Sequence, residues 1–229
     1  MLRIDCTDPA RRASAVAAAL AACRRGDVVL VPTESSYALA TDAFSARGRA
    51  AIRTAKGQGA QVPLPVLVPS ATTVQGLAAR IPQPAAALMA AFWPGALTLL
   101  VPAQSTLAWD VPADTPIAVR MPLHPLLISL LEQTGPLAAT AANGPGLDPP
   151  ASVDDAAEQL GEAWAIALDA GPLAPGEAST IVDVTGDVPV VRRHGAVSLE
   201  DLRSVCPQVE DPTEDPTQAP AQGTAASGE

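Results

Sequence analysis

The sequence predicts a single α/β domain built on a mixed β-sheet flanked by helices. Short apolar runs rich in Val, Leu, Ile and Ala alternate with segments of helical periodicity, and the connections between them are short. Prolines border several of the apolar runs. A purely parallel sheet is therefore disfavoured, because proline cannot donate a ladder hydrogen bond.

The first elements have clear end signals. Asp8 and Pro9 predict a helix start, and this helix should run to about Arg25, where Gly26 ends it. The β-branched run 27–31 predicts a buried strand that Pro32 stops. Ser45 then caps a second helix.

The later elements follow from the same signals. We expect, in order, a strand over 64–68, helices over 70–80 and 84–92, strands over 97–101 and 117–120, a helix over 123–134, a strand over 137–140, a helix over 152–160, strands over 165–168, 180–184 and 188–192, and a short helix from 198. The residues from Pro207 onward are polar, acidic and aperiodic. They predict a domain over 1–206 and a disordered, Pro-rich tail over 207–229.

Composition limits the functions that are open. The 229 residues carry a formal net charge of −10, which argues against direct binding of nucleic acid, since such binding needs a basic footprint. Three widely spaced cysteines imply no disulfide framework, and two histidines without a CxxC motif argue against a structural or catalytic zinc site. No apolar run approaches the ~20 residues of a membrane span, and the lipoprotein-like Leu20–Cys23 lacks a basic leader. We expect a cytoplasmic protein.

The common phosphate-binding and nucleophile motifs are absent, but one cation stands out. Lys56 is the only lysine among 14 basic residues, and it follows Arg49 and Arg53 on one helical face before a Gly-rich turn. Two interpretations stay open: a solvated basic face, or a set of cations facing a phosphate group. Hydroxyl and guanidinium groups also lie at the ends of other predicted strands, as expected around an anionic ligand: 33–37 follow a strand, Arg120 and 192–193 end strands, and Ser179 precedes one.

Several stretches together resemble the L-threonylcarbamoyladenylate synthases of the YrdC-like family. They are VVLVPTESSYALATDAF, AKGQGAQVPLPVLV, FWPGALTLLV, IAVRMPLHP, PLAATAANGPG, LDAGP and ASTIVDVTG…VVRRHG, in the order and spacing of the family. The resemblance implies a twisted α/β fold with a concave basic cavity. It also implies a nucleotidyltransferase that joins L-threonine, bicarbonate and ATP into threonylcarbamoyl-AMP, with release of pyrophosphate, for modification of a tRNA adenosine. The resemblance further implies magnesium as a cofactor and downstream tRNA-modification proteins as partners.

The same resemblance assigns site residues. Lys56 matches a lysine beside the nucleotide and the carbamate and is the implied catalytic residue. The implied threonine-binding residues are Ser35, Arg120 and Ser179, and the implied nucleotide-binding positions are Lys56, Gln58, Ala141, Asn143 and Arg193. A planar guanidinium is the natural partner of a carboxylate, which suits Arg120.

This sequence departs from the family pattern at the nucleotide side. Gln58 replaces an arginine, Ala141 replaces a serine, and Ala38 and Ala40 replace glycines whose loss predicts strain if their φ is positive. Arg53 is a candidate to contact the phosphates in place of the arginine that Gln58 replaces. The alternative function is therefore a weakened or inactive family member that binds a nucleotide or an amino acid.

Overall fold

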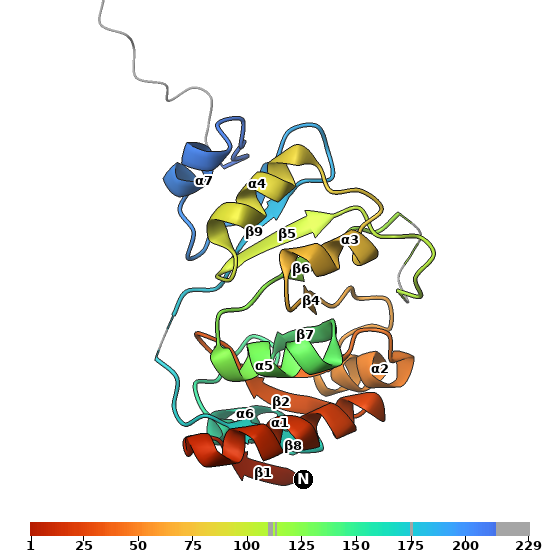
Figure 1. The fold of residues 1–229 in the computed structure, drawn as a ribbon, viewed down its shortest axis with the longest axis vertical. Coiled ribbons are helices and arrows are strands. Elements are labelled where there is room, and N and C mark those ends of the chain that lie inside the picture. Colours follow the sequence, from red (N-terminus) through yellow and green to blue (C-terminus); the bar gives the residue numbers. More distant parts are fainter. Residues whose placement is uncertain (110–111, 113, 175, 214–229) are drawn as a thin grey trace, which may run out of the picture.

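A ten-stranded mixed sheet organises the fold in a computed structural model that describes residues 1–109, 112, 114–174 and 176–213 (Figure 1). Its strand order is β1-β8-β2-β3-β7-β4-β6-β5-β9-β10. The strands are β1 (Leu2–Asp5), β2 (Val29–Pro32), β3 (Tyr37–Asp42), β4 (Val66–Leu67), β5 (Leu97–Val101), β6 (Ile117–Arg120), β7 (Leu137–Ala141), β8 (Ile166–Asp169), β9 (Thr180–Asp183) and β10 (Val190–Arg193). Parallel and antiparallel pairs both occur, which confirms the predicted mixed sheet.

Seven α-helices and one 3₁₀ turn occur in the described part of the chain. They are α1 (Pro9–Arg24), α2 (Ala46–Ala55), the 3₁₀ turn η1 (Ala71–Thr73), α3 (Val74–Leu77), α4 (Gln83–Phe92), α5 (Pro125–Thr134), α6 (Val153–Leu160) and α7 (Leu199–Val205). The predicted caps form: Ser45, Ser152 and Ser198 each accept a backbone N–H from the first turn of the following helix. None of the described helices is long and apolar enough to cross a membrane.

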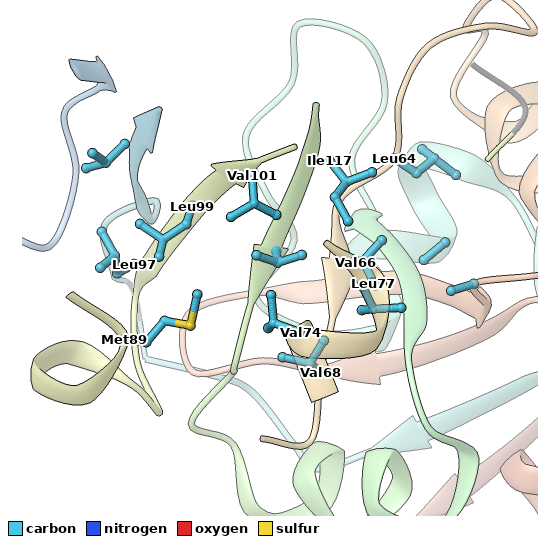
Figure 2. Packing of buried hydrophobic residues seen from close by; sticks show 14 of the residues in the cluster. Leu64, Val66, Val68, Val74, Leu77, Met89, Leu97, Leu99, Val101 and Ile117 are labelled. Atoms are coloured by element: carbon cyan, nitrogen blue, oxygen red, sulfur yellow. The ribbon is translucent and has the colours of Figure 1, made fainter. Parts of the chain in front are cut away.

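Two apolar clusters lie on opposite faces of the sheet. In the larger one, Leu99 and Ile117 from the strands pack with Leu77 of α3 and Met89 of α4 (Figure 2). The smaller one joins α1 and α5 to β2, β3, β7 and β8, and Leu67 is its one member from the strands β4, β6, β5, β9 and β10. One face of that half of the sheet is therefore not covered by the α1–α5 layer.

Three differences from the predicted elements are explained by pairing with segments that are distant in the sequence. β1 and β3 were not expected from the sequence. β1 is an edge strand held by parallel pairing with β8, and β3 lies between β2 and β7. The predicted helix over 70–80 is divided into η1 and α3 and ends early, because Ala78 leaves the helix to form an antiparallel bridge with Ala103.

The residues after Cys206 pack against the body as far as the structure describes them. Val209 is 2% exposed, and Glu210 exchanges backbone hydrogen bonds with Pro189 and Val191 beside β10. Asp211 lies 3.0 Å from the His194 ring. The boundary expected after Cys206 falls inside this packed segment, and residues 214–229 of the expected tail lie outside the described residues.

Removing the packed segment should therefore destabilise the protein. A chain that ends at Cys206 loses the buried Val209 side chain and the bridge to β10, and we expect the free energy of unfolding to fall by about 2–4 kcal/mol. A chain that ends at Thr213 should unfold like the full-length protein. Urea denaturation of both truncations, with Val209→Ala as an intermediate case, checks this; equal midpoints for the two truncations would contradict it.

Candidate functional site

The sequence-predicted site residues occur at the ends of strands and in the loops that follow. In β6, Ile117 and Val119 point into the larger apolar cluster, so Ala118 and Arg120 point to the opposite face. Thr98 of β5 lies on that same face by alternation with Leu97 and Leu99. This is the face that α1 and α5 leave uncovered, and it presents polar side chains where a core would need apolar ones.

Arg120, at the end of β6, is held by two groups. Its Nε donates to the Gly95 carbonyl at 2.9 Å, and its Nη2 forms an ion pair with Glu34 Oε1. The two side chains are only 14% and 21% exposed. Burial, together with the charge of Arg193, lowers the pKa of Arg120 to about 10, so its guanidinium is charged at neutral pH.

Ser179 and Arg193 form a second group next to Arg120. Arg193 Nη2 donates to the carbonyl and the Oγ of Ser179 at 2.7 and 3.0 Å, and Ser179 Oγ lies 2.9 Å from Thr98 Oγ1. The antiparallel register that pairs Leu99 with Val119 places Thr98 beside Arg120, so the contact of Thr98 with Ser179 joins the two groups. Thus Arg120, Ser179 and Arg193 belong to one polar cluster.

Lys56 lies at the C-terminal end of α2 and is 8% exposed. Its ammonium donates to the Ala141 carbonyl at 2.9 Å, to Asn143 Oδ1 at 2.6 Å and to the Asn143 carbonyl. An ammonium has three N–H groups, so each has an oxygen acceptor here. All three acceptors are uncharged, and burial lowers the Lys56 pKa.

Asn143 continues this group into the loop after β7. Its Nδ2 donates to the Leu147 carbonyl at 2.6 Å, while its carboxamide and backbone oxygens accept from Lys56. The lysine therefore fixes the course of the loop that carries the predicted nucleotide-binding asparagine. An uncharged side chain at 56 would leave these oxygens without their donor.

The loop between β2 and β3 lies next to both the Arg120 group and the Lys56 group. Thr33 Oγ1 donates to the Ser36 carbonyl at 2.7 Å and closes the turn, Glu34 reaches Arg120, and the Ala142 N–H donates to the Tyr37 carbonyl at 2.9 Å. Ser35 is half-buried, and a Cβ added at Gly176 would lie 2.8 Å from the Ser35 Cβ. The segment that leads to Ser179 thus passes directly over Ser35.

The departures from the family pattern cause no backbone strain. Asp114 is the only non-glycine residue with positive φ among those described, so Ala38 and Ala40 are ordinary residues of β3. They are 5% and 0% exposed and pack in the α1–α5 cluster. The strain considered for these alanines is absent. Gln58 is exposed, with its backbone N–H bound to the Arg53 carbonyl at 2.8 Å.

The basic face considered for α2 is not solvated. Arg49 and Arg53 are 3% and 4% exposed. Arg49 donates to the carbonyls of Ala43 and Ala108, and Arg53 Nε donates to the Val62 carbonyl at 2.9 Å. Both arginines tie neighbouring segments to α2. Because Arg53 is buried in this structural role, it is poorly placed to bind a phosphate group instead of an arginine at position 58.

Two hollows elsewhere involve none of the residues that the family resemblance assigns to the site. A small one of about 10 Å³ lies beside Arg49, Arg53 and Trp109. A groove of about 360 Å³ runs between α3 and α4 and is lined by Gln75, Met89 and other small or apolar side chains. Among the residues described, no group of three or more His, Cys, Asp or Glu side chains could hold a metal ion.

Two contacts of the site are not expected from the sequence. In the sequence, Glu34 is one polar residue of a hydroxyl-rich turn, and Thr98 belongs to an apolar strand. An acidic residue directly after a buried strand is the available signal for Glu34, since a carboxylate there needs a partner. The signal for Thr98 is weaker, a hydroxyl alternating with leucines.

Comparison with known proteins agrees with this geometry. Residues 21–195 match the Sua5/yciO/yrdC family model, which carries the description Telomere recombination. A Mycobacterium tuberculosis protein provisionally assigned as a threonylcarbamoyl-AMP synthase is 43% identical over 202 residues, covering 88% of this chain and 93% of its own. The threonylcarbamoyl-AMP synthase of Bacillus subtilis is 35% identical over 193 residues, which cover 83% of this chain and 56% of the relative.

Solved structures give the same result. Sua5 of Pyrococcus abyssi in complex with L-threonine superimposes with a TM-score of 0.83 at 30% identity, covering 92% of this chain. This chain spans 62% of that longer protein. E. coli YciO, with a TM-score of 0.76 at 21% identity, shares the fold. The chain therefore belongs to the Sua5/YciO/YrdC family.

Proposed function

We propose that this protein is a threonylcarbamoyl-AMP synthase, a nucleotidyltransferase that supplies tRNA modification. The single observation that carries the proposal is the polar cluster of Arg120, Ser179 and Arg193 on the face of the sheet that α1 and α5 do not cover. It is supported by the names of the relatives and by the L-threonine bound to the Pyrococcus protein. The substrates would be L-threonine, bicarbonate and ATP, and the site would lie in the cytoplasm.

The charges of the side chains suggest which substrate group each of them would bind. Arg120 would hold the threonine carboxylate, with Ser35 and Ser179 beside the substrate. After the α-ammonium loses a proton to solvent, the neutral amine would attack the carbon of bicarbonate with loss of water, and the resulting carbamate oxygen would attack the α-phosphorus of ATP, displacing pyrophosphate. Positively charged groups close to the phosphate oxygens stabilise charge in such a transfer. Lys56, Asn143 and Arg193 are the groups proposed for the nucleotide.

Lys56 would act in part through the loop after β7. Its three N–H groups are bound to oxygens of Ala141 and Asn143. A phosphate oxygen would have to replace one of these acceptors, and the other two would keep Asn143 in place. Convergence of the Lys56 and Arg120 groups on one concave surface is part of the proposal, with the loop between β2 and β3 as their connection.

Magnesium is proposed only as the companion of the ATP phosphates. Among the described residues there is no group of three or more His, Cys, Asp or Glu side chains that could hold a metal ion. Magnesium ions commonly keep several waters and bind through substrate phosphates with one or two carboxylates. The ion would therefore arrive and leave with the nucleotide.

The test of the proposed function is pyrophosphate release by the purified full-length chain. ATP, L-threonine and bicarbonate are supplied together and then omitted one at a time. We expect release only when all three are present, with threonylcarbamoyl-AMP as the second product. Thermal stabilisation by ATP or threonine without any release would instead favour a non-catalytic binding protein.

Introducing an arginine at position 58 should tighten nucleotide binding. Gln58 is exposed, and a Cβ built at the preceding Gly57 would meet no atom within 4 Å, so the longer side chain in Gln58→Arg has room. We expect the Kd for ATP to fall about ten- to a hundredfold through charge-assisted hydrogen bonds, with a smaller gain from Ala141→Ser. Calorimetry at one salt concentration measures both variants. Gln61→Arg, also at an exposed site, is the control for added charge, and an equal gain there would contradict a specific contact.

A further inference from the structure

Glu34 is the charged group of the site that the proposed reaction does not use. It precedes Ser35 in the loop between β2 and β3, and its Oε1 pairs with Arg120. Its other oxygen, Oε2, accepts from the Leu123 backbone N–H at 3.5 Å. The carboxylate therefore lies between the turn that carries one predicted threonine contact and the arginine that is another.

The Arg120 guanidinium still has donors for a ligand. A guanidinium carries five N–H groups along two edges that can each match a carboxylate. Two of its nitrogens are already engaged: Nε donates to the Gly95 carbonyl, and Nη2 pairs with the Glu34 carboxylate. Among the described residues, Nη1 makes no hydrogen bond or ion pair. A ligand carboxylate can therefore bind Nη1 while Glu34 stays paired with the buried Nη2.

We propose that Glu34 and Arg120 together recognise both charged groups of an α-amino acid. Arg120 binds the α-carboxylate through Nη1, and the Glu34 carboxylate binds the α-ammonium through Oε2, since Nη2 and Oε1 are buried against each other. The two opposite charges of the ligand are attached to one carbon atom and thus match two opposite charges held side by side in the protein. This inference rests on the proposed function and adds to it the residue that selects for the amino group.

A competing role for Glu34 predicts the opposite change in amino-acid affinity when Glu34 is neutralised. If Glu34 only occupies Arg120 until a substrate carboxylate displaces it, neutralising Glu34 should strengthen amino-acid binding. If Glu34 holds the ammonium, neutralising it should weaken binding, and only for ligands with an amino group. The substitution Glu34→Gln removes the charge while keeping size and shape, so it separates the two roles.

The experiment compares two ligands on the full-length protein by calorimetry. The ligands are L-threonine and 3-hydroxybutanoate, which keeps the carboxylate and hydroxyl but lacks the α-amino group. The unchanged protein should prefer threonine at least tenfold. In Glu34→Gln the Kd for threonine should rise about ten- to a hundredfold and the preference should disappear, while the Kd for ATP stays within twofold. Glu132→Gln, at an exposed carboxylate of α5, is the matched control and should change nothing.

Each other outcome overturns the inference in a recognisable way. Tighter threonine binding by Glu34→Gln means that Glu34 competes with the substrate. An unchanged affinity and preference mean that the amino group is recognised elsewhere, and the proposed function then stands. A parent protein that binds neither threonine nor ATP overturns this inference and the proposed function together. If Glu34→Gln folds poorly, Glu34→Asp keeps the charge and must keep a preference for threonine; equal binding of the two ligands would count against the inference.

Discussion

Replacing Lys56 by alanine should reduce threonylcarbamoyl-AMP formation more than a hundredfold. The substitution removes the only lysine of the chain and leaves three oxygens of Ala141 and Asn143 without their charged donor. A hydrogen bond to a charged group contributes roughly 1.5–3 kcal/mol, so the loop that carries Asn143 should lose its fixed course as well as its charge. Pyrophosphate release and the Kd for ATP measure the loss.

A cation on the same helix provides the control for Lys56. Arg47 of α2 is 77% exposed and pairs with Asp27 at the surface, so Arg47→Ala should leave turnover within twofold of the parent. Lys56→Arg tests whether charge alone suffices: a planar guanidinium cannot donate to these oxygens in the same directions, and we expect most activity to be lost. Turnover by Lys56→Ala within threefold of the parent would exclude the lysine from the reaction.

The elements with strong end signals were predictable. Strands 97–101 and 117–120 coincide with β5 and β6, because each is a β-branched or leucine-rich run bounded by prolines or a charge. The helix begun by Ser45 coincides with α2, since the cap defines its start locally. Such signals depend on neighbours in the sequence and survive the formation of the fold.

The strand β3 shows why other elements were missed. Its sequence, Tyr37–Asp42, contains two alanines and follows a hydroxyl-rich turn, so it lacks both alternation and a β-branched run. Pairing with β2 on one side and β7 on the other makes it a strand, and β7 is distant from it in the sequence. Burial on both faces then favours small side chains at 38 and 40. Tertiary context, rather than local propensity, decides this segment.

The site was predictable in its residue types and less so in its contacts. Arg120 at the end of an apolar strand required a partner, but the sequence did not identify Glu34, which lies far earlier in the chain, because β2 and β6 are related only through the order of the whole sheet. The same limit applies to Arg49 and Arg53. Their spacing was compatible with a solvated face. Only the structure shows that they are buried and that they donate to the carbonyls of Ala43, Val62 and Ala108.

Replacing Arg120 by methionine should weaken threonine binding more than a hundredfold and also destabilise the fold. Methionine keeps much of the volume but leaves Glu34, 21% exposed, without its cationic partner. Removing one member of a buried ion pair costs about 3–5 kcal/mol, and the partial exposure of this pair places the expected loss at or below the lower end, about 2–3 kcal/mol. Urea denaturation and calorimetry with L-threonine measure the two effects separately.

A double variant separates the structural effect from the functional one. Arg120→Met combined with Glu34→Gln removes both charges, so no unpaired carboxylate remains and most of the lost stability should return. Threonine binding should not return, since neither charged group of the amino acid then has a partner. If the double variant recovered binding together with stability, Arg120 would act only by holding the loop between β2 and β3, and the threonine site would have to lie elsewhere. If Arg120→Met alone changed neither quantity, the ion pair between β6 and that loop would be dispensable for both fold and function.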